Sequence, residues 1–400
     1  MPSCNLPIHG EHVARKLKLD CRHYRGDRPC AAGIQGVCPT ACEHYDPMGT
    51  RILIIKLAAL GDVIRTGALL PGIKRAWPQS HVTWVSRPNG VRMLAHHPLI
   101  DRLLPFGAES ICHLEYERFD LCLSLDKEPG PAALAMRVDA RERRGIGLSA
   151  TGAVYPLNPE CGHYFELGLD DTLKFHENTK SYQRLIYEAL GLEYRGEKYE
   201  LHPADTDRRR AARVWERLGV GPDERVVGLN TGAGHVFANK SWLPEKFARF
   251  ARQLTKRCGC RVALLGGPGE ASINRRLAAE NSELLDTGTD HVELTFAAIV
   301  ERCDALVTGD TMALHVAVAL DVPCVALFGP TCAQEIDLYG RGTALRTSLA
   351  CSPCYRRSCD VSPNCMKDIP IADALAAVEH WLGTSTRRRA KPTFIAEPVV

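Results

Sequence analysis

The stretch that decides the fold is Arg51-Ile-Leu-Ile-Ile-Lys-Leu-Ala-Ala-Leu-Gly-Asp62. Its apolar run is short, continuous and rich in β-branched residues, which is typical of a buried strand. Gly61 permits a tight turn, and Asp62 is expected at the start of a helix whose spacing runs from Val63 to Trp77, where Pro78 stops it. A buried strand, a turn and a helix form the first half of a βαβ unit, so this stretch predicts a parallel sheet covered by helices.

The same alternation continues on both sides of a polar region at residues 191–224. Strands that alternate with helices favour parallel sheets, so the sequence predicts an α/β protein with two open parallel-sheet domains. Such domains bind ligands at the carboxyl ends of their strands, and we expect the chemistry in the loops that follow strands. The further strands are expected at 81–86, 120–125, 225–230, 261–265, 305–308 and 324–328, and helices at 208–218, 244–258, 312–320 and 371–382.

Changes in composition divide the chain into four parts. Residues 1–48 are rich in Cys, Pro, Gly and His and lack a sustained hydrophobic period, so they form a Cys-rich extension. Residues 49–205 form the N-terminal domain and residues 206–384 the C-terminal domain. The tail 385–400 carries three consecutive arginines and two prolines, and we expect it to be disordered.

Composition excludes several classes of protein. Of 400 residues, 45% are apolar and 24% charged, which is ordinary for globular domains. The 50 Lys and Arg nearly balance the 47 Asp and Glu, so there is no basic excess of the kind that nucleic-acid binding requires. No apolar run approaches the ~18–20 residues of a membrane span, and the first residues show no secretory signal. We therefore expect a cytoplasmic protein with no nucleic-acid partner.

Cysteine is unusually frequent, with 17 residues. The number is odd and no secretory signal is visible, so a disulfide framework is not expected. Cys122, Cys303 and Cys324 stand among apolar neighbours and are expected to be small buried hydrophobic residues. Four thiolates can close a zinc site or hold an iron–sulfur cluster, the alternative being free thiols. Two sets have such spacing, Cys21, Cys30, Cys38 and Cys42, and then Cys351, Cys354, Cys359 and Cys365.

Asp62 is the first chemical candidate. One interpretation is a capping carboxylate, which a helix N-terminus favours. The other is a general base held where the two domains face each other. The helix terminus would lower its pKa and make it a weak base, but such a group can still accept a proton late in a displacement.

Two further loops in the second half are rich in glycine. Thr231, Gly232 and Gly234 follow a strand, where small residues let the backbone approach an anion, and Lys240 supplies charge nearby. Gly267 and Glu270 follow the next strand, with the carboxylate placed where a ribose could be bound. The alternatives are a structural turn and a solvated surface lysine.

The fourth loop is Thr308-Gly-Asp-Thr-Met-Ala-Leu-His315. Asp310 and Thr311 stand at the start of a helix whose free N–H groups form an anion site. Taken alone, His315 is more typical of a packed core residue than of a ligand. Asp205-Thr-Asp207 has the spacing of a divalent-metal motif, but it precedes three arginines and a helix, which favours an N-terminal cap cluster.

Taken in order, these loops resemble the ADP-heptose:lipopolysaccharide heptosyltransferases, glycosyltransferase family 9, over roughly residues 50–382. Each motif is common, whereas their order and spacing are specific. The Cys-rich extension lies outside the family core. The matching stretches are Ile54-Ile-Lys-Leu-Ala-Ala-Leu-Gly-Asp-Val-Ile-Arg-Thr66, Gly228-Leu-Asn-Thr-Gly-Ala-Gly234 with Lys240-Ser-Trp242, Gly309-Asp-Thr311 with His315, and Phe328-Gly-Pro-Thr331.

The resemblance implies a GT-B fold, in which two Rossmann-like domains face each other across a cleft. It implies inverting transfer of a heptose from an ADP-linked donor, without a metal ion or cofactor in catalysis. By resemblance, Asp62 is the base and Lys240 meets the donor phosphates, while Glu270 contacts the nucleoside. Asp310, Thr311 and His315 would hold the diphosphate and sugar hydroxyls. Met312 stands where many members have glycine, and its side chain is expected to narrow the donor pocket.

The resemblance also implies a lipid-linked acceptor of lipopolysaccharide-core type at the inner face of the cytoplasmic membrane. Arg141, Arg143 and Arg144, with Arg387–Arg389, could meet anionic head groups, the alternative being a solvated surface. Two other functions stay open. One is a GT-B transferase or epimerase that uses another nucleotide sugar, and the other is a metal-binding regulatory protein on an inactive transferase scaffold.

Overall fold

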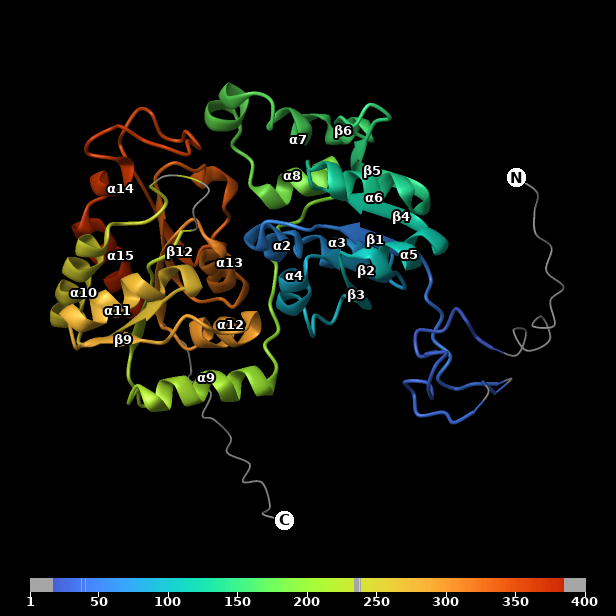
Figure 1. Cartoon of the computed structure of the whole chain (residues 1–400), viewed down its shortest axis with the longest axis horizontal. Helices are drawn as coiled ribbons and strands as arrows, with labels where there is room; N and C mark the ends of the chain where they lie inside the picture. The colour runs from blue at the N-terminus through green and yellow to red at the C-terminus, as the bar shows by residue number, and fades with distance from the viewer. Residues whose placement is uncertain (1–16, 37, 40, 234–236, 238, 385–400) are drawn as a thin grey trace, which may run out of the picture.

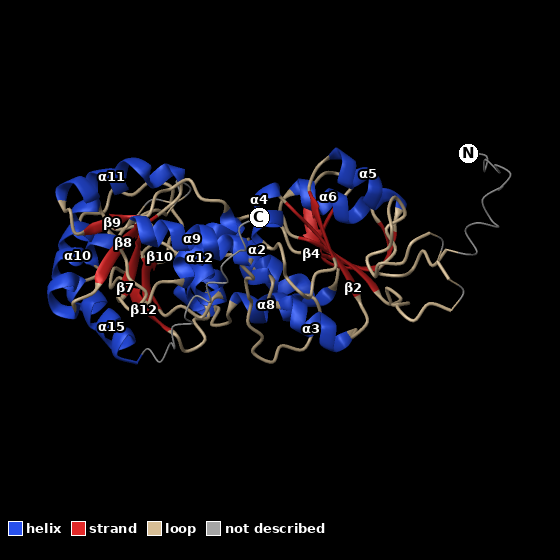
Figure 2. Ribbon diagram, turned by 90° about the horizontal axis from the view of Figure 1, so that it is seen from below, coloured by secondary structure: helices blue, strands red, loops and turns tan. Residues whose placement is uncertain are grey.

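The computed structural model describes residues 17–36, 38–39, 41–233, 237 and 239–384. Two α/β domains lie next to each other, with the N-terminal domain on the right in Figure 1 and the C-terminal domain on the left. Each is built on a mainly parallel sheet with helices on both faces, which is visible in Figure 2. The predicted α/β class is therefore confirmed. The basic tail and residues 1–16 lie outside the described residues.

The N-terminal sheet has the strand order β3-β2-β1-β4-β5-β6. All neighbouring pairs are parallel except β5 with β6. Four of the five residues of β1 are buried, as its apolar run predicts, because helices cover both faces of the sheet. The strands are β1 Arg51–Ile55, β2 His81–Ser86, β3 Arg102–Pro105, β4 Arg118–Ser124, β5 Asp139–Leu148 and β6 Val154–Pro156.

The helix expected from Val63 to Trp77 is two helices, so that prediction is wrong in detail. The chain turns at Gly67 and Ala68 between them, yet Val63 and Leu69 pack into the same core, which explains the continuous helical spacing. Asp62 is the third residue of the first helix rather than its opening residue. The helices of this domain are α2 Leu60–Thr66, α3 Leu69–Ala76, α4 Pro88–Met93, α5 Ala108–Tyr116, α6 Pro129–Arg137, α7 Gly162–Glu166 and α8 Tyr182–Ala189.

The C-terminal sheet repeats the architecture with the order β12-β11-β10-β7-β8-β9, all pairs parallel. The expected strands and helices of this half are present within a few residues of their predicted ends. Its strands are β7 Val226–Asn230, β8 Arg261–Leu265, β9 Leu284–Asp286, β10 Ala305–Gly309, β11 Cys324–Phe328 and β12 Gly342–Arg346. Its helices are α9 Asp205–Arg217, α10 Pro244–Cys258, α11 Ala271–Glu280, α12 Glu293–Glu301, α13 Met312–Ala319, α14 Cys365–Asp368 and α15 Ile371–Thr384.

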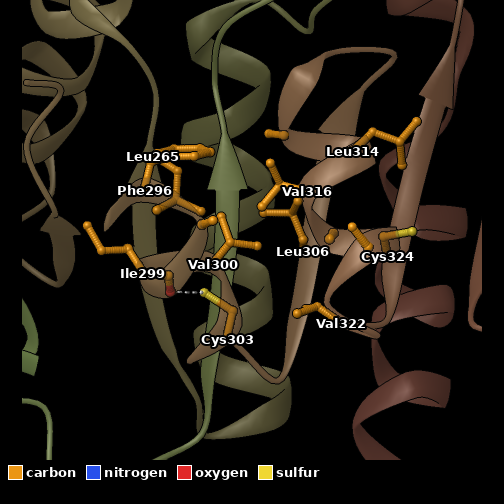
Figure 3. Close-up of a cluster of buried hydrophobic side chains, with 14 of the residues drawn as sticks. Leu265, Phe296, Ile299, Val300, Cys303, Leu306, Leu314, Val316, Val322 and Cys324 are labelled. Atoms are coloured by element: carbon orange, nitrogen blue, oxygen red, sulfur yellow. Dashed lines mark hydrogen bonds between the residues drawn. The ribbon is translucent and has the colours of Figure 1, made fainter. Parts of the chain in front are cut away.

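One hydrophobic core of the C-terminal domain lies on the face of the sheet against α10 and α15, and another lies on the opposite face, between the sheet and helices α12 and α13 (Figure 3). Cys303 and Cys324 are almost fully buried there, and Cys122 is buried in the other domain, as expected of small apolar residues. The Cys303 thiol donates to the Ile299 carbonyl oxygen 3.7 Å away. Because this core supports β10 and α13, truncation of Leu306 to alanine would cost about 2–5 kcal/mol and loosen the loop between them.

The same core crosses the domain boundary. Ile64 and Ala68 of the N-terminal domain belong to it, together with Leu314 of α13. Helix α2, which follows β1, therefore packs against α13, which follows β10 (Figure 1). The loops at the carboxyl ends of these central strands consequently meet at one domain junction. None of the described helices is both long and apolar enough to span a membrane.

Candidate active site at the domain junction

Asp62 lies at the junction and caps its own helix. Its carboxylate accepts a hydrogen bond from the Ala59 N–H at 3.3 Å. It also accepts from Arg65, with the Nε and Nη2 atoms 2.9 and 2.7 Å from Oδ1. The Asp62 side chain keeps 33% of its surface exposed, whereas Arg65 keeps 12%. Capping and access to a substrate are therefore both possible for this one carboxylate.

The charges around Asp62 decide its protonation state. Burial by itself raises the pKa of the carboxyl, but the positive charges of Arg65 and Lys56 outweigh it, with His315 adding to them. The net effect lowers the pKa of Asp62 to about 2. The carboxylate is thus ionised at neutral pH, as a proton acceptor must be before reaction.

His315 joins the two domains beside Asp62. A Cβ atom at Gly61 would stand 2.6 Å from His315 Cδ2, so only glycine allows the imidazole to approach the α2 backbone. The Tyr199 hydroxyl lies 3.2 Å from His315 Nδ1. Burial, together with the Arg65 charge, lowers the pKa of His315 to about 4, so the ring is neutral near pH 7. His315 is both a packed residue and a polar group within electrostatic reach of Asp62 and Asp310.

The loops of the C-terminal domain converge on the same junction. The Asn230 side-chain amide donates to the Gly232 carbonyl oxygen at 2.9 Å and to the hydroxyl oxygens of Thr308 and Thr311 at 3.2 and 3.3 Å. Asn230, which the sequence analysis did not single out as a side chain, thus ties the loop after β7 to the start of α13. Its place at the end of β7 is the signal that could have identified it.

Lys240 and Asp310 form an ion pair at this junction. Lys240 Nζ lies 3.6 Å from Asp310 Oδ2, and the two side chains keep 15% and 18% of their surface exposed. Thr311 is the N-cap residue of α13, whose first N–H groups point toward the same loop. A cation and a helix N-terminus therefore lie together, which is the arrangement that a diphosphate requires.

Glu270 closes the loop after β8. It ends a short 3₁₀ turn, Pro268–Glu270, and its Oε2 accepts from the Gly267 N–H at 2.8 Å. A Cβ atom at Gly232 would lie 2.2 Å from the Glu270 carboxyl carbon, so the glycine makes room for this side chain. Thr231 is buried, and its hydroxyl donates to Asn274 at 2.6 Å. Its N–H donates to the Leu265 carbonyl oxygen and its own carbonyl oxygen accepts from the Ser241 hydroxyl, so a contact of Thr231 with the donor stays a prediction. Gly234 lies outside the described residues.

Several charged residues near Asp62 were missed. Lys56 and Asp126 form a buried ion pair at the ends of β1 and β4. Burial, with the charge of Lys174, lowers the pKa of the neighbouring Lys127 to about 8. Burial raises the pKa of Glu335, although Arg65 and Lys174 oppose it. The sequence could have identified Asp126 and Lys127, because both directly follow an expected strand.

Two other motifs have structural roles. The Arg143 guanidinium donates to the Ala135, Val138 and Ala140 carbonyl oxygens, and Arg144 Nη1 donates to the Leu190 carbonyl oxygen. These contacts favour a structural role over lipid contact for both arginines, which with Arg141 lie in β5. The Asp207 carboxylate accepts from the Ala204 N–H and from the Thr295 hydroxyl, which favours the cap interpretation of Asp205-Thr-Asp207.

Each predicted cysteine set surrounds one cavity. Cys21, Cys30, Cys38 and Cys42 line a cavity of about 230 Å³. The second set, Cys351, Cys354, Cys359 and Cys365, lines a cavity of about 20 Å³ next to Asn239 and Gly329. Among the described residues, no three His, Cys, Asp or Glu side chains lie close enough together to hold a metal ion as they stand. Metal binding at either set stays a prediction.

The sequence profile of glycosyltransferase family 9 (heptosyltransferase) matches residues 113–364, which is more than half of the chain. This chain belongs to glycosyltransferase family 9. It is 28% identical to lipopolysaccharide heptosyltransferase 1 of Pseudomonas aeruginosa over 342 residues, which cover 78% of this chain and 88% of that relative. The profile match spans the loops with Lys240, Glu270 and Asp310, and the family resemblance is thereby confirmed.

Solved structures of the family share the fold. A family 9 glycosyltransferase from Veillonella parvula superposes with a TM-score of 0.68 at 20% identity, covering 84% of this chain and 98% of that one. The Escherichia coli heptosyltransferase WaaC with ADP superposes with a TM-score of 0.54 at 16% identity, covering 83% and 97%. The two facing parallel-sheet domains are thus the GT-B architecture of the family, as predicted.

Proposed function

We propose that this family 9 member transfers a heptose from an ADP-heptose donor to a lipopolysaccharide-core-type saccharide, with inversion at the anomeric carbon. The single observation that carries the proposal is the meeting of Asp62, His315 and the Lys240–Asp310 pair at one junction. Similarity to a lipopolysaccharide heptosyltransferase and to the heptosyltransferase WaaC with ADP supports the sugar and the nucleotide.

The acceptor side of the reaction depends on Asp62. The acceptor hydroxyl oxygen attacks the anomeric carbon while the bond from that carbon to the diphosphate oxygen breaks, and the hydroxyl proton passes to the Asp62 carboxylate. A carboxylate with a pKa of about 2 is a weak base, so proton transfer comes late, after the new bond has largely formed. Arg65 holds the carboxylate in place through two contacts to Oδ1. Oδ2 accepts the Ala59 N–H at 3.3 Å and has a second lone pair for the acceptor hydroxyl.

The donor side depends on positive charge aimed at the leaving group. Negative charge develops on ADP as the bond breaks, through an oxocarbenium-like state. Lys240 and the N-terminus of α13 lie where they can stabilise that charge, so we propose that no metal ion takes part in the transfer. Glu270 and Gly267 lie in the loop after β8, at the edge where the nucleoside of such a donor would bind.

Two features bear on the identity of the substrates. Met312 is partly buried against the core that supports α13, so its side chain packs there as well as next to the donor loop. On the acceptor side, Lys127 and Lys174 add positive charge to that of Arg65, which favours an anionic saccharide acceptor. The proposal includes a lipid-linked acceptor at a membrane face. We assign the contact between the protein and the membrane to no particular residue.

Calorimetry of ADP, UDP and GDP with the purified protein tests the nucleotide. We expect ADP to bind at least tenfold more tightly than the other two. Release of ADP from ADP-heptose in the presence of a heptose-deficient lipopolysaccharide then tests transfer, and the anomeric configuration of the product tests inversion. A preference for UDP or GDP would favour a transferase or epimerase that uses another nucleotide sugar. Nucleotide binding without transfer to any acceptor would favour the inactive scaffold.

A further inference from the structure

The N-terminal extension places four cysteines around one cavity far from the active site. Cys21, Cys30, Cys38 and Cys42 all line it, with the imidazoles of His23 and His44 at its wall. Cys21 is 7% exposed and the other three thiols are half-buried. These cysteines are spread over 22 positions of the sequence, so the fold of the segment brings them together.

This segment is folded without a core of its own. Among its described residues, Cys21 alone is buried, and none belongs to a hydrophobic cluster. Its regular structure within that part is one isolated bridge between Cys21 and Pro47. Yet the backbone closes on itself, since the Arg22 N–H donates to Asp46 and the Met48 N–H donates to Asp20, both at 2.8 Å.

Such a segment needs a cross-link to stay folded. Below about 40 residues a chain buries too little apolar surface to offset its conformational entropy, and disulfides or metals supply the missing stabilisation. The backbone hydrogen bonds cannot replace them, because each contributes only about 1 kcal/mol net. Four thiols around one cavity are the residues from which such a cross-link is made.

The segment is fixed to the N-terminal domain at the opposite end from the junction. Arg22 forms an ion pair with Asp101 and donates to the carbonyl oxygens of Gln79 and Ser80 at 2.5 and 2.9 Å. These carbonyls precede β2, whereas the active site lies beyond the carboxyl ends of the strands. Figure 1 shows the segment in blue at the right edge, away from the C-terminal domain. A ligand here would act on stability and surface shape rather than on sugar transfer.

We propose that the thiolates of Cys21, Cys30, Cys38 and Cys42 bind one zinc-type metal ion in a tetrahedral site. Four thiols lose their protons to the solvent as the ion binds, giving a site with two net negative charges. Lys18 and Arg28 line the same cavity, and although Arg28 also pairs with Asp27, their positive charges offset part of that charge. This inference is independent of the proposed transferase function, since residues 17–48 lie outside the part matched by the family profile.

The size of the cavity indicates that the segment must contract to bind one metal ion. A volume of about 230 Å³ is far more than one ion needs, since a water molecule occupies only about 10–15 Å³ on the same measure. The thiols are not at ligand distance in the structure, so the segment must contract around the ion. Metal binding should therefore compact residues 17–48 and protect the exposed Arg25 from trypsin.

Metal analysis of the full chain tests the proposal. Protein loaded with Zn²⁺ and desalted should hold one equivalent more than the variant with Cys30→Ser and Cys42→Ser. The matched control is Cys112→Ser, an exposed cysteine of α5 outside both sets, which should lose none. The metal contents of the variants are compared because the second cysteine set can bind a metal ion of its own, which would add equally to the content of each protein. Loading with Co²⁺ should give the intense visible bands of a tetrahedral thiolate site, reduced by one equivalent in the double variant.

A second measurement guards against misfolding of the variant. Wild-type protein treated with a chelator should be cut by trypsin within residues 17–48 at least tenfold faster than zinc-loaded protein, while residues 51–384 stay intact. Equal metal content in wild type and double variant would overturn the proposal. So would a mass showing two disulfides in this segment, or acid-labile sulfide with iron, which would indicate a cluster instead of one ion.

Discussion

The substitution Asp62→Asn separates the proposed base from the capping role of the same residue. An asparagine oxygen can still accept the Ala59 N–H, so helix α2 keeps its N-terminal hydrogen bond. What is lost is the charge that pairs with Arg65 and the site to which the acceptor proton moves. Activity should therefore fall far more than stability.

The magnitude of the stability change follows from the pKa of Asp62, which is lowered from 3.8 to about 2. Because the folded pKa is the lower one, the ionised carboxylate stabilises the fold above pH 3.8, and this contribution is lost as the pH falls toward 2. This difference in pKa corresponds to roughly 2.5 kcal/mol. The carboxylate is one-third exposed, so solvent screening reduces the expected loss to about 1 kcal/mol, or about 2–4 °C in Tm.

The assay compares kcat for ADP release from ADP-heptose with the Kd for ADP measured by calorimetry. Removal of a general base should lower kcat by about 10²–10⁴-fold and leave the Kd for ADP within about threefold. The matched control is Asp373→Asn, an exposed acid at the same third position of helix α15. Transfer within tenfold of wild type would refute the assignment of Asp62, as would an equal loss of ADP binding and turnover.

Three further predictions concern the junction. Gly61→Ala would place a Cβ atom 2.6 Å from His315, so the imidazole or helix α2 must move, and we expect at least a tenfold loss of kcat. The control Gly130→Ala in α6, where a Cβ atom meets nothing within 4 Å, should be silent. Lys240→Ala should weaken ADP binding and lower kcat by at least tenfold, with partial rescue by Lys240→Arg, and unchanged calorimetry would contradict it. The pKa of His315 is lowered from 6.5 to about 4, so its stabilising contribution is present above pH 6.5 and is lost as the pH falls toward 4. His315→Gln should therefore flatten the pH dependence of Tm in that window, and parallel curves for the variant and wild type would exclude this role.

Local sequence patterns predicted the buried strands of the two sheets. The runs of β1, β8 and β11 were found because strands covered on both faces are almost continuously apolar, and β2 was found from its β-branched and aromatic residues. The single helix expected after β1 was wrong, because two short helices that line one core leave the same spacing as one long helix. Strand β5 was not predicted, and its arginines were interpreted only as a basic run. Arg143 and Arg144 use their side chains to bind backbone carbonyl oxygens, so the strand does not show the usual alternation of apolar and polar residues.

The sequence by itself determined the two parallel-sheet domains and the loops that carry Asp62, Lys240 and Asp310, because strand ends and helix starts are local properties of the chain. Only the tertiary structure decided that Gly61 lies against His315. The reason is physical: contacts between residues about 250 positions apart depend on how two folded domains pack. No local pattern records that packing, whereas a hydrophobic period records the burial of a single strand.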